Sequence, residues 1–316
     1  MNNMIEVRRL KKYFKTPRGM CHAVDDVSLA VERGKTLGVV GESGCGKSTL
    51  GRTMIRILDS TEGKILLNGE DITNITGSEL KKVREKMQII FQDPYSSLNP
   101  RLTARETIEE VMKISGRYPR KEIGERANAI MNLVGIDNRI KNSFPHELDG
   151  GRRQRIGIAR ALALNPELVI CDEPVSALDV SIQAQVLNLL QDLQDQMKLT
   201  YIFITHDLSV VRYLANQICV MYLGQVVELS DTKEVFERQL HPYTKALLSA
   251  IPVPDIHTKM KREILRGEVT SPIDPKPGCR FAARCRFACE RCSQPQELRE
   301  VSPGHFAACC RVDEIN

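Results

Sequence analysis

The chain has 316 residues and a formal net charge of +5, which results from 45 basic and 40 acidic residues. The basic residues are scattered along the sequence, so the charge does not indicate nucleic acid as a partner. No stretch approaches the roughly 18 consecutive apolar residues of a membrane helix, and the first residues lack the apolar core of a signal peptide. We therefore expect a cytoplasmic chain with one α/β domain, residues 1–250, and a tail, residues 251–316.

The predicted elements begin with residues 5–10 and 23–31, where apolar and polar residues alternate as in antiparallel strands. A buried strand is predicted over 36–40 and a helix over 48–58, with a glycine-rich loop between them. Helical patterns then predominate, which predicts a helical insert of about residues 97–160. Two apolar strands are predicted further along the chain, at 168–173 and 201–206.

The glycine-rich loop, residues 41–48, reads Gly-Glu-Ser-Gly-Cys-Gly-Lys-Ser and is a complete phosphate-binding loop in its strand–loop–helix context. Backbone N–H groups that converge at a helix N-terminus favour anionic phosphates. Lys47 is expected to reach the β and γ phosphates of a nucleoside triphosphate, and the Ser48 hydroxyl to ligate Mg²⁺. The nucleotide contacts predicted for this segment are Gly41, Ser43, Gly44, Cys45, Gly46, Lys47, Ser48 and Thr49.

Polar side chains follow three of the predicted strands. Asp172 and Glu173 form a pair at one strand end, a placement that suits one carboxylate to hold Mg²⁺ through water and the other to polarise an attacking water. His206 follows the next strand and can contact the γ-phosphate or that water. Gln92 follows the strand 87–91 and can reach the metal and the water from a loop.

These motifs occur in one order, and residues 4–250 resemble the ATP-binding subunits of ATP-binding cassette (ABC) transporters. The resemblance implies an α/β ABC ATPase fold, a RecA-like core with an antiparallel β subdomain and the helical insert. It implies that Glu173 is the catalytic base, His206 the switch histidine and Gln92 a lever toward the membrane subunits. Phe14, with Tyr13 as the second choice, would stack on adenine. The motifs that carry the resemblance are the phosphate loop, 92–94, 148–155, 170–174, 176–179 with the dimer-contact residue Asp179, and 205–207.

Two further segments, 92–101 and 241–248, are similar to the oligopeptide and dipeptide importer branch, which includes nickel and glutathione importers. This resemblance implies a peripheral ATPase on the cytoplasmic face of the membrane, with two permease subunits and, indirectly, an extracytoplasmic solute-binding protein. A paralogous ATPase, the D-type subunit, would pair with this chain, because residues 267–279 are closer to the F-type subunit. Nickel or glutathione import, a regulatory subunit and a soluble non-transport ATPase are the alternatives.

One motif departs from the family, whose signature usually reads Leu-Ser-Gly-Gly-Gln. Here Asp149 replaces the Ser and Arg152 the Gln, on either side of Gly150 and Gly151. Asp149 can still cap the following helix. Its carboxylate would face the γ-phosphate held by the opposite subunit, however, and two like charges about 4 Å apart repel by about 4 kcal/mol at an effective dielectric near 20. Arg152 would offset part of this cost, and we expect an asymmetric heterodimer with one weakened site.

Six of the ten cysteines crowd into the tail, at 279, 285, 289, 292, 309 and 310. Thiolate ligands suit zinc or an iron–sulfur cluster, and spacing alone does not separate these from a set of reduced surface thiols. In the branch that the chain resembles, some members carry a 4Fe-4S cluster on a similar tail. The resemblance implies Cys279, Cys285, Cys292 and Cys309 as its ligands, with Cys310 or Cys289 as substitutes. The expected cofactors are thus ATP, Mg²⁺ and a 4Fe-4S cluster.

Overall fold

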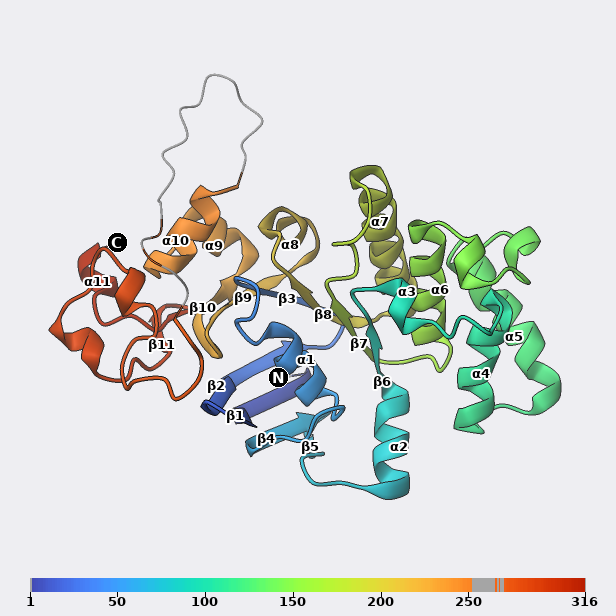
Figure 1. The fold of residues 1–316 in the computed structure, drawn as a ribbon, viewed down its shortest axis with the longest axis horizontal. Coiled ribbons are helices and arrows are strands. Elements are labelled where there is room, and N and C mark those ends of the chain that lie inside the picture. Colours follow the sequence, from blue (N-terminus) through green and yellow to red (C-terminus); the bar gives the residue numbers. More distant parts are fainter. Residues whose placement is uncertain (1, 252–264, 266, 268–269, 316) are drawn as a thin grey trace, which may run out of the picture. The chain divides into compact units, whose positions relative to one another are not determined.

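The computed structural model describes residues 2–251, 265, 267 and 270–315 (Figure 1). The part of the predicted linker between 252 and 269 lies outside the described residues, apart from 265 and 267. The chain divides into two compact units. Unit 1 comprises residues 1–31, 35–73 and 203–316, and unit 2 comprises residues 32–34 and 74–202. Residues after 250 therefore belong to the same compact unit as the N-terminus.

Unit 1 contains an antiparallel sheet with the strand order β2-β1-β4-β5. Ile5 and Val7 of β1 face Leu67 and Ile65 of β4 in an antiparallel register, and all four side chains are buried. Polar residues alternate with them on the opposite face, as the sequence pattern predicts. The strands are β1 (Asn3–Thr16), β2 (Gly19–Glu32), β4 (Glu62–Leu67) and β5 (Glu70–Asp71).

Unit 1 contributes five strands of the second, eight-stranded sheet, in the order β11-β12-β10-β9-β3. The apolar strand β3 pairs in parallel with β9, whereas β10, β12 and β11 are joined to it by antiparallel pairs. The tail thus extends this sheet through β12 (Figure 1). The strands are β3 (Thr36–Val40), β9 (Gln217–Tyr222), β10 (Gln225–Asp231), β11 (Arg299–Ser302) and β12 (His305–Ala307).

The helices of unit 1 are short. Helix α1 ends at Met54, four residues before the predicted end at 58, because Arg56 adopts a left-handed conformation with φ +58°. The N–H groups of Ile57 and Leu58 both turn back to the Arg52 carbonyl. These helices are α1 (Lys47–Met54), α8 (Leu208–Leu214), α9 (Thr232–Glu237), α10 (Pro242–Ser249), η3 (Ala282–Arg284), η4 (Glu290–Ser293) and α11 (Val312–Ile315).

Unit 2 joins two parallel strands to a group of helices. The apolar strand β7 (Leu168–Asp172) is fully buried and pairs with β6 (Met87–Ile90). Residues 94–162, all of which the structure describes, contain helices and no strand, and α4, α5 and α6 pack side by side (Figure 1). β8 (Thr200–Thr205) spans the boundary between the units. The helices are α2 (Gly77–Lys86), α3 (Pro94–Ser97), α4 (Ala104–Ser115), α5 (Arg120–Leu133), η1 (Asn138–Ile140), η2 (Pro145–Glu147), α6 (Gly150–Leu162) and α7 (Val180–Met197).

Candidate active site

The phosphate loop of unit 1 leaves β3 and enters α1 at Gly46. Gly46 has φ +103°, and a Cβ there would lie 2.0 Å from the carbonyl oxygen of Ala23, so only glycine fits. The Lys47 side chain is only 4% exposed, and its Nζ donates to the carbonyl oxygens of Gly41 and Glu42, at 2.9 Å each. The lysine therefore curls over the loop, and α1 begins with no side-chain cap. Both features fit a phosphate cradle.

The two aromatic candidates for adenine stacking lie at the end of β1. Tyr13 is already engaged: its ring stacks on His22 with centroids 4.0 Å apart, and its hydroxyl donates to Asp25. Burial and this hydrogen bond raise the pKa of Tyr13 well above its ordinary value. Phe14 is 37% exposed, with the Lys12 ammonium 5.0 Å from its ring centroid. Phe14 therefore offers the more accessible ring face of the two.

The carboxylate pair lies in unit 2 at the end of β7. Asp172 is 1% exposed, whereas Glu173 is half-buried and has a left-handed backbone with φ +47°. A non-glycine residue in this conformation is strained, and such residues concentrate at functional sites. The Gln92 amide, which follows β6, donates to the Glu173 carboxylate over 3.0 Å. The structure therefore brings Gln92 and Glu173, 81 residues apart in sequence, into direct contact.

His206 belongs to unit 1 and follows β8, where its side chain is exposed. Asp207 caps the next helix, because its carboxylate accepts a hydrogen bond from the Ser209 N–H at 2.8 Å. The cap fixes the chain direction directly after His206. The imidazole therefore stands at the carboxyl end of a buried strand, as predicted.

The signature segment lies at the start of α6 in unit 2. Asp149 is the N-cap, and its Oδ1 accepts from the Arg152 N–H at 2.8 Å, which confirms the predicted cap. The Arg152 Nε lies 3.4 Å from the second carboxylate oxygen. Arg152 is therefore the counter-ion of Asp149. Both side chains are more than half exposed, so the ion pair contributes little to stability.

The glycines of the signature segment pack closely on the beginning of α7. A Cβ at Gly151 would lie 2.7 Å from a methyl of Ile182, and one at Gly150 would lie 3.0 Å from Leu178. Asp179 directly follows Leu178 and is the exposed N-cap residue of α7. Asp149, Gly150, Gly151 and Asp179 thus belong to one packed region of unit 2.

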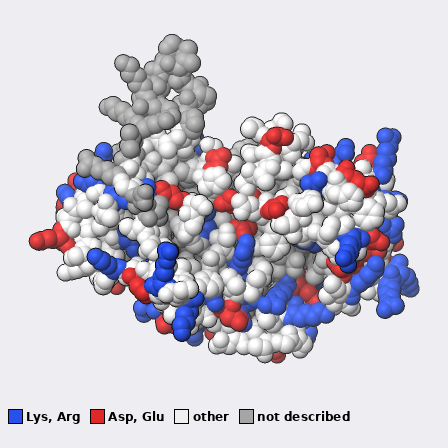
Figure 2. All heavy atoms as spheres, in the orientation of Figure 1, with Lys and Arg blue, Asp and Glu red and all other residues white. Residues whose placement is uncertain are grey.

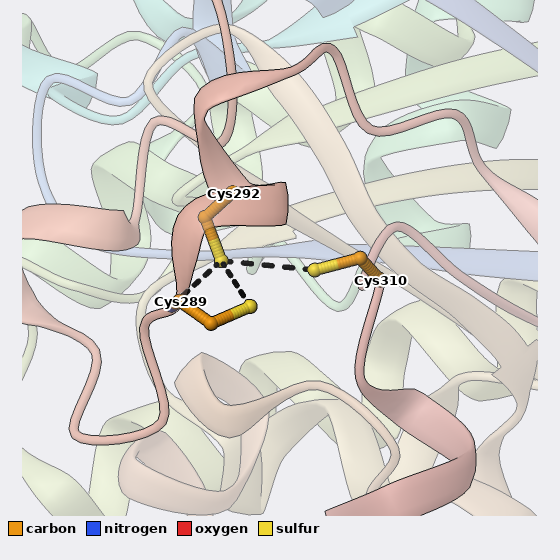
Figure 3. A group of neighbouring side chains, drawn as sticks. All are labelled: Cys289, Cys292 and Cys310. Atoms are coloured by element: carbon orange, nitrogen blue, oxygen red, sulfur yellow. Dashed lines mark hydrogen bonds between the residues drawn. The ribbon is translucent and has the colours of Figure 1, made fainter.

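The tail brings three cysteines together. The sulfurs of Cys289, Cys292 and Cys310 all lie within 4.8 Å of one another (Figure 3). Figure 3 shows the Cys292 sulfur linked to those of both Cys289 and Cys310, with Cys289 directly before the short helix that carries Cys292 and Cys310 on another segment of the tail. This group can hold a metal ion. The group found among the described residues consists of one predicted ligand, Cys292, and the two predicted substitutes, Cys289 and Cys310.

The remaining predicted ligands, Cys279, Cys285 and Cys309, pack against apolar side chains, and each of their thiols also interacts electrostatically with Cys292. Burial raises the pKa of Cys279 to about 11 and also raises the pKa of Cys285 and Cys309. Thiols with a raised pKa stay protonated at neutral pH, so metal binding would have to release their protons. The Cys289-x-x-Cys292 spacing is the local sequence signal for one pair of the group, whereas Cys310 enters the prediction only through the family resemblance.

Two observations bear on the partners. On the face shown in Figure 2, acidic and basic side chains are interspersed, in agreement with the scattered charges of the sequence. Within the described ranges, none of the helices combines the length and apolar character needed to span a bilayer.

Two family models match the sequence. The one described as ABC transporter matches residues 24–176. The one described as oligopeptide/dipeptide transporter, C-terminal region, matches residues 227–292. The second match covers α10 and most of the cysteine-rich tail, which are the parts that distinguish this chain from an isolated cassette.

Several relatives are similar over nearly their whole length. The oligopeptide transport ATP-binding protein AppF of Bacillus subtilis (strain 168) is 50% identical over 317 residues, which cover 97% of this chain and 96% of AppF. The oligopeptide transport ATP-binding protein OppF of Salmonella typhimurium is 48% identical over 313 residues, which cover 98% of this chain and 94% of OppF.

Solved structures confirm the predicted fold. The dimeric ATP-binding cassette MJ0796, in a post-hydrolysis state bound to ADP and Pi, matches with a TM-score of 0.67 and 29% identity over 72% of this chain and 99% of that chain. The cbiO1 protein of Clostridium perfringens, part of an ABC transporter complex, matches with a TM-score of 0.67 and 28% identity over 76% of this chain and 92% of its own. This chain therefore belongs to the ATP-binding proteins of ABC transporters, in the oligopeptide transport branch.

Proposed function

We propose that this chain is the F-type ATPase subunit that powers the import of oligopeptides or dipeptides. The similarity to AppF and OppF over nearly the full chain supports the peptide substrate. The observation that carries the chemistry is the contact between Gln92 and Glu173 at the end of β7. In this contact the Gln92 amide, which can reach the nucleotide, is hydrogen-bonded to the Glu173 carboxylate, which can polarise water.

Each predicted site residue has a proposed role. Phe14, Gly41 and residues 43–49 would hold ATP, and Ser48, Gln92 and Asp172 would hold Mg²⁺. Mg²⁺ neutralises phosphate charge when it is bound. Glu173 would accept a proton from the attacking water, and His206 would orient that water and the γ-phosphate.

The signature segment supports an asymmetric pair with a D-type ATPase. In this arrangement the phosphate loop, Glu173 and His206 work against the signature of the partner, with Asp179 at the contact between the two subunits. The signature of this chain completes the site on the partner, where the Asp149 carboxylate weakens the binding of the γ-phosphate. A regulatory role, the second candidate, rests on the same replacement and predicts ATP binding with no turnover.

The helical part of unit 2 supports docking of two permease subunits on the cytoplasmic face of a membrane. Tyr95, directly after the Gln92 loop, is 55% exposed, and Ile114 at the end of α4 is 70% exposed. We expect these side chains to be covered when a permease docks. Gln92 lies on the loop after β6 and Tyr95 on α3, three residues further along the chain, so a permease that contacts Tyr95 can shift the residue that contacts Glu173.

The cysteine group supports a metal centre in the tail, and we assign it to a 4Fe-4S cluster. A fourth thiolate is required, and we propose Cys279, whose N–H donates to the Cys292 carbonyl oxygen at 2.8 Å. Anaerobically purified protein should contain about four irons per chain and absorb visible light. Bound zinc in place of iron would remove the cluster assignment.

Copurification of the tagged chain tests the function as a whole. We expect a paralogous ATPase, two permeases and a solute-binding protein that carries peptide. Vesicles with the purified complex should take up labelled peptide in an ATP-dependent manner. Uptake of nickel or glutathione without peptide uptake would replace the proposed substrate, and isolation without any membrane partner would favour a soluble ATPase.

A further inference from the structure

Glu42, the second residue of the phosphate loop, is held at three points. Its carboxylate accepts two hydrogen bonds from the Arg284 guanidinium, at 2.7 and 3.1 Å. Its N–H donates to the Tyr243 hydroxyl at 2.8 Å, and its carbonyl accepts from Lys47. Arg284 belongs to the tail and Tyr243 to α10, so elements more than 200 residues away in sequence fix this loop residue.

Arg284 is itself firmly placed. Its side chain is 8% exposed, and it ends the short helix η3. Phe281, one residue before η3, packs edge-on against Tyr222 with ring centroids 5.3 Å apart, and it lies 5.4 Å from the Tyr243 ring. The same aromatic cluster therefore positions both contacts of Glu42.

Further contacts dock the tail on unit 1. The N–H of Asp274 donates to the Met20 carbonyl at 2.9 Å, and its carboxylate accepts from the Met20 N–H at 3.0 Å. The buried Arg280 donates to the Leu223 carbonyl and to the Asp25 carboxylate. Arg284 is thus presented to the phosphate loop by a segment that is anchored at two points before it, and little side-chain entropy remains to be lost when it binds Glu42.

The charge balance gives this clamp a consequence for the nucleotide. A free carboxylate in a loop that receives phosphates would repel them, and a bidentate guanidinium both neutralises and orients it. We propose that Arg284 is a positioning residue for ATP, which acts through Glu42, so that the tail sets the affinity of the phosphate loop of its own chain. A change in the conformation of the tail would therefore change the affinity of the nucleotide site.

Equilibrium binding of a fluorescent ATP analogue to the full-length chain tests this proposal. Arg284→Gln should raise the Kd roughly tenfold, within the range of typical coupling between sites. Arg284→Lys keeps the charge and loses the planar fork, so its Kd should lie between those of wild type and Arg284→Gln. The matched control is Arg299→Gln, in the same tail, because the ion pair of Arg299 with Asp313 lies on the surface; its Kd should not change.

A double-mutant cycle separates the proposal from simple loss of structure. Because the harm in Arg284→Gln comes from the unpaired Glu42 carboxylate, adding Glu42→Gln should restore most of the affinity. Thermal unfolding of each variant is measured in parallel. An unchanged Kd in Arg284→Gln, or a double variant as weak as the single one, would overturn the proposal.

Discussion

Gln92 and Glu173 form a direct hydrogen bond, 3.0 Å from the amide nitrogen to the carboxylate oxygen, at the strand end where hydrolysis is proposed. The contact is internal to unit 2, so it exists without any partner. It ties the loop that follows β6 to the carboxylate after β7. A movement of that loop therefore either carries the Glu173 side chain with it or breaks this bond. The contact therefore makes Glu173 the first residue to test.

Glu173→Gln should lower ATP hydrolysis by the assembled complex at least 100-fold, the usual scale for loss of a positioned general base. The Kd for ATP should change by no more than about twofold, because the amide has the same shape as the carboxylate. Hydrolysis is lost because the amide cannot accept the proton of the attacking water. Phosphate release and nucleotide titration measure the two effects. Glu122→Gln, on the surface of α5, is the control. A loss of only half of the activity would mean that both sites of the pair work equally.

Asp149→Ser should raise hydrolysis at the site of the partner subunit, since serine keeps an N-cap acceptor and removes the negative charge. Asp149→Ala removes the cap as well and should cost about 1 kcal/mol of stability. Comparing the two variants by phosphate release and by chemical denaturation separates charge from capping. Equal hydrolysis by wild type and Asp149→Ser would show that the signature carboxylate does not limit turnover.

His241 predicts a loss of stability in acid. Burial lowers its pKa to about 4, against an ordinary 6.5, although the nearby Glu228 opposes the shift. The unfolded chain therefore binds more protons between these values, and stability falls as the pH drops from 7 toward 4. The loss between pH 7 and 5 should be about 2 kcal/mol.

Urea denaturation at the two pH values measures this change. The neutral Nδ1 of His241 accepts from the Tyr243 N–H at 3.1 Å, and asparagine can replace that acceptor. His241→Asn should therefore flatten the pH dependence while the fold is kept. If the slope in this pH window is the same in His241→Asn and wild type, other groups account for it.

Cys292→Ser should remove most of the metal that copurifies with the chain, because its sulfur contacts those of both Cys289 and Cys310. Elemental analysis of anaerobically purified protein measures iron and zinc together. Cys21→Ser is the control, since Cys21 lies on β2 and outside the cysteine group. Full metal content in Cys292→Ser would place the metal elsewhere.

The sequence by itself determined the phosphate loop, the carboxylate pair after an apolar strand and the capping role of Asp149. Each of these depends on residues that are neighbours in the chain, so spacing and hydrophobic pattern are sufficient. Only the tertiary structure decided which cysteines gather, because Cys310 reaches Cys292 through a turn of the tail that no local pattern specifies. It also decided that Arg284 holds Glu42, 242 residues away, since such a pair forms only after the tail has packed on the aromatic side chains beneath it.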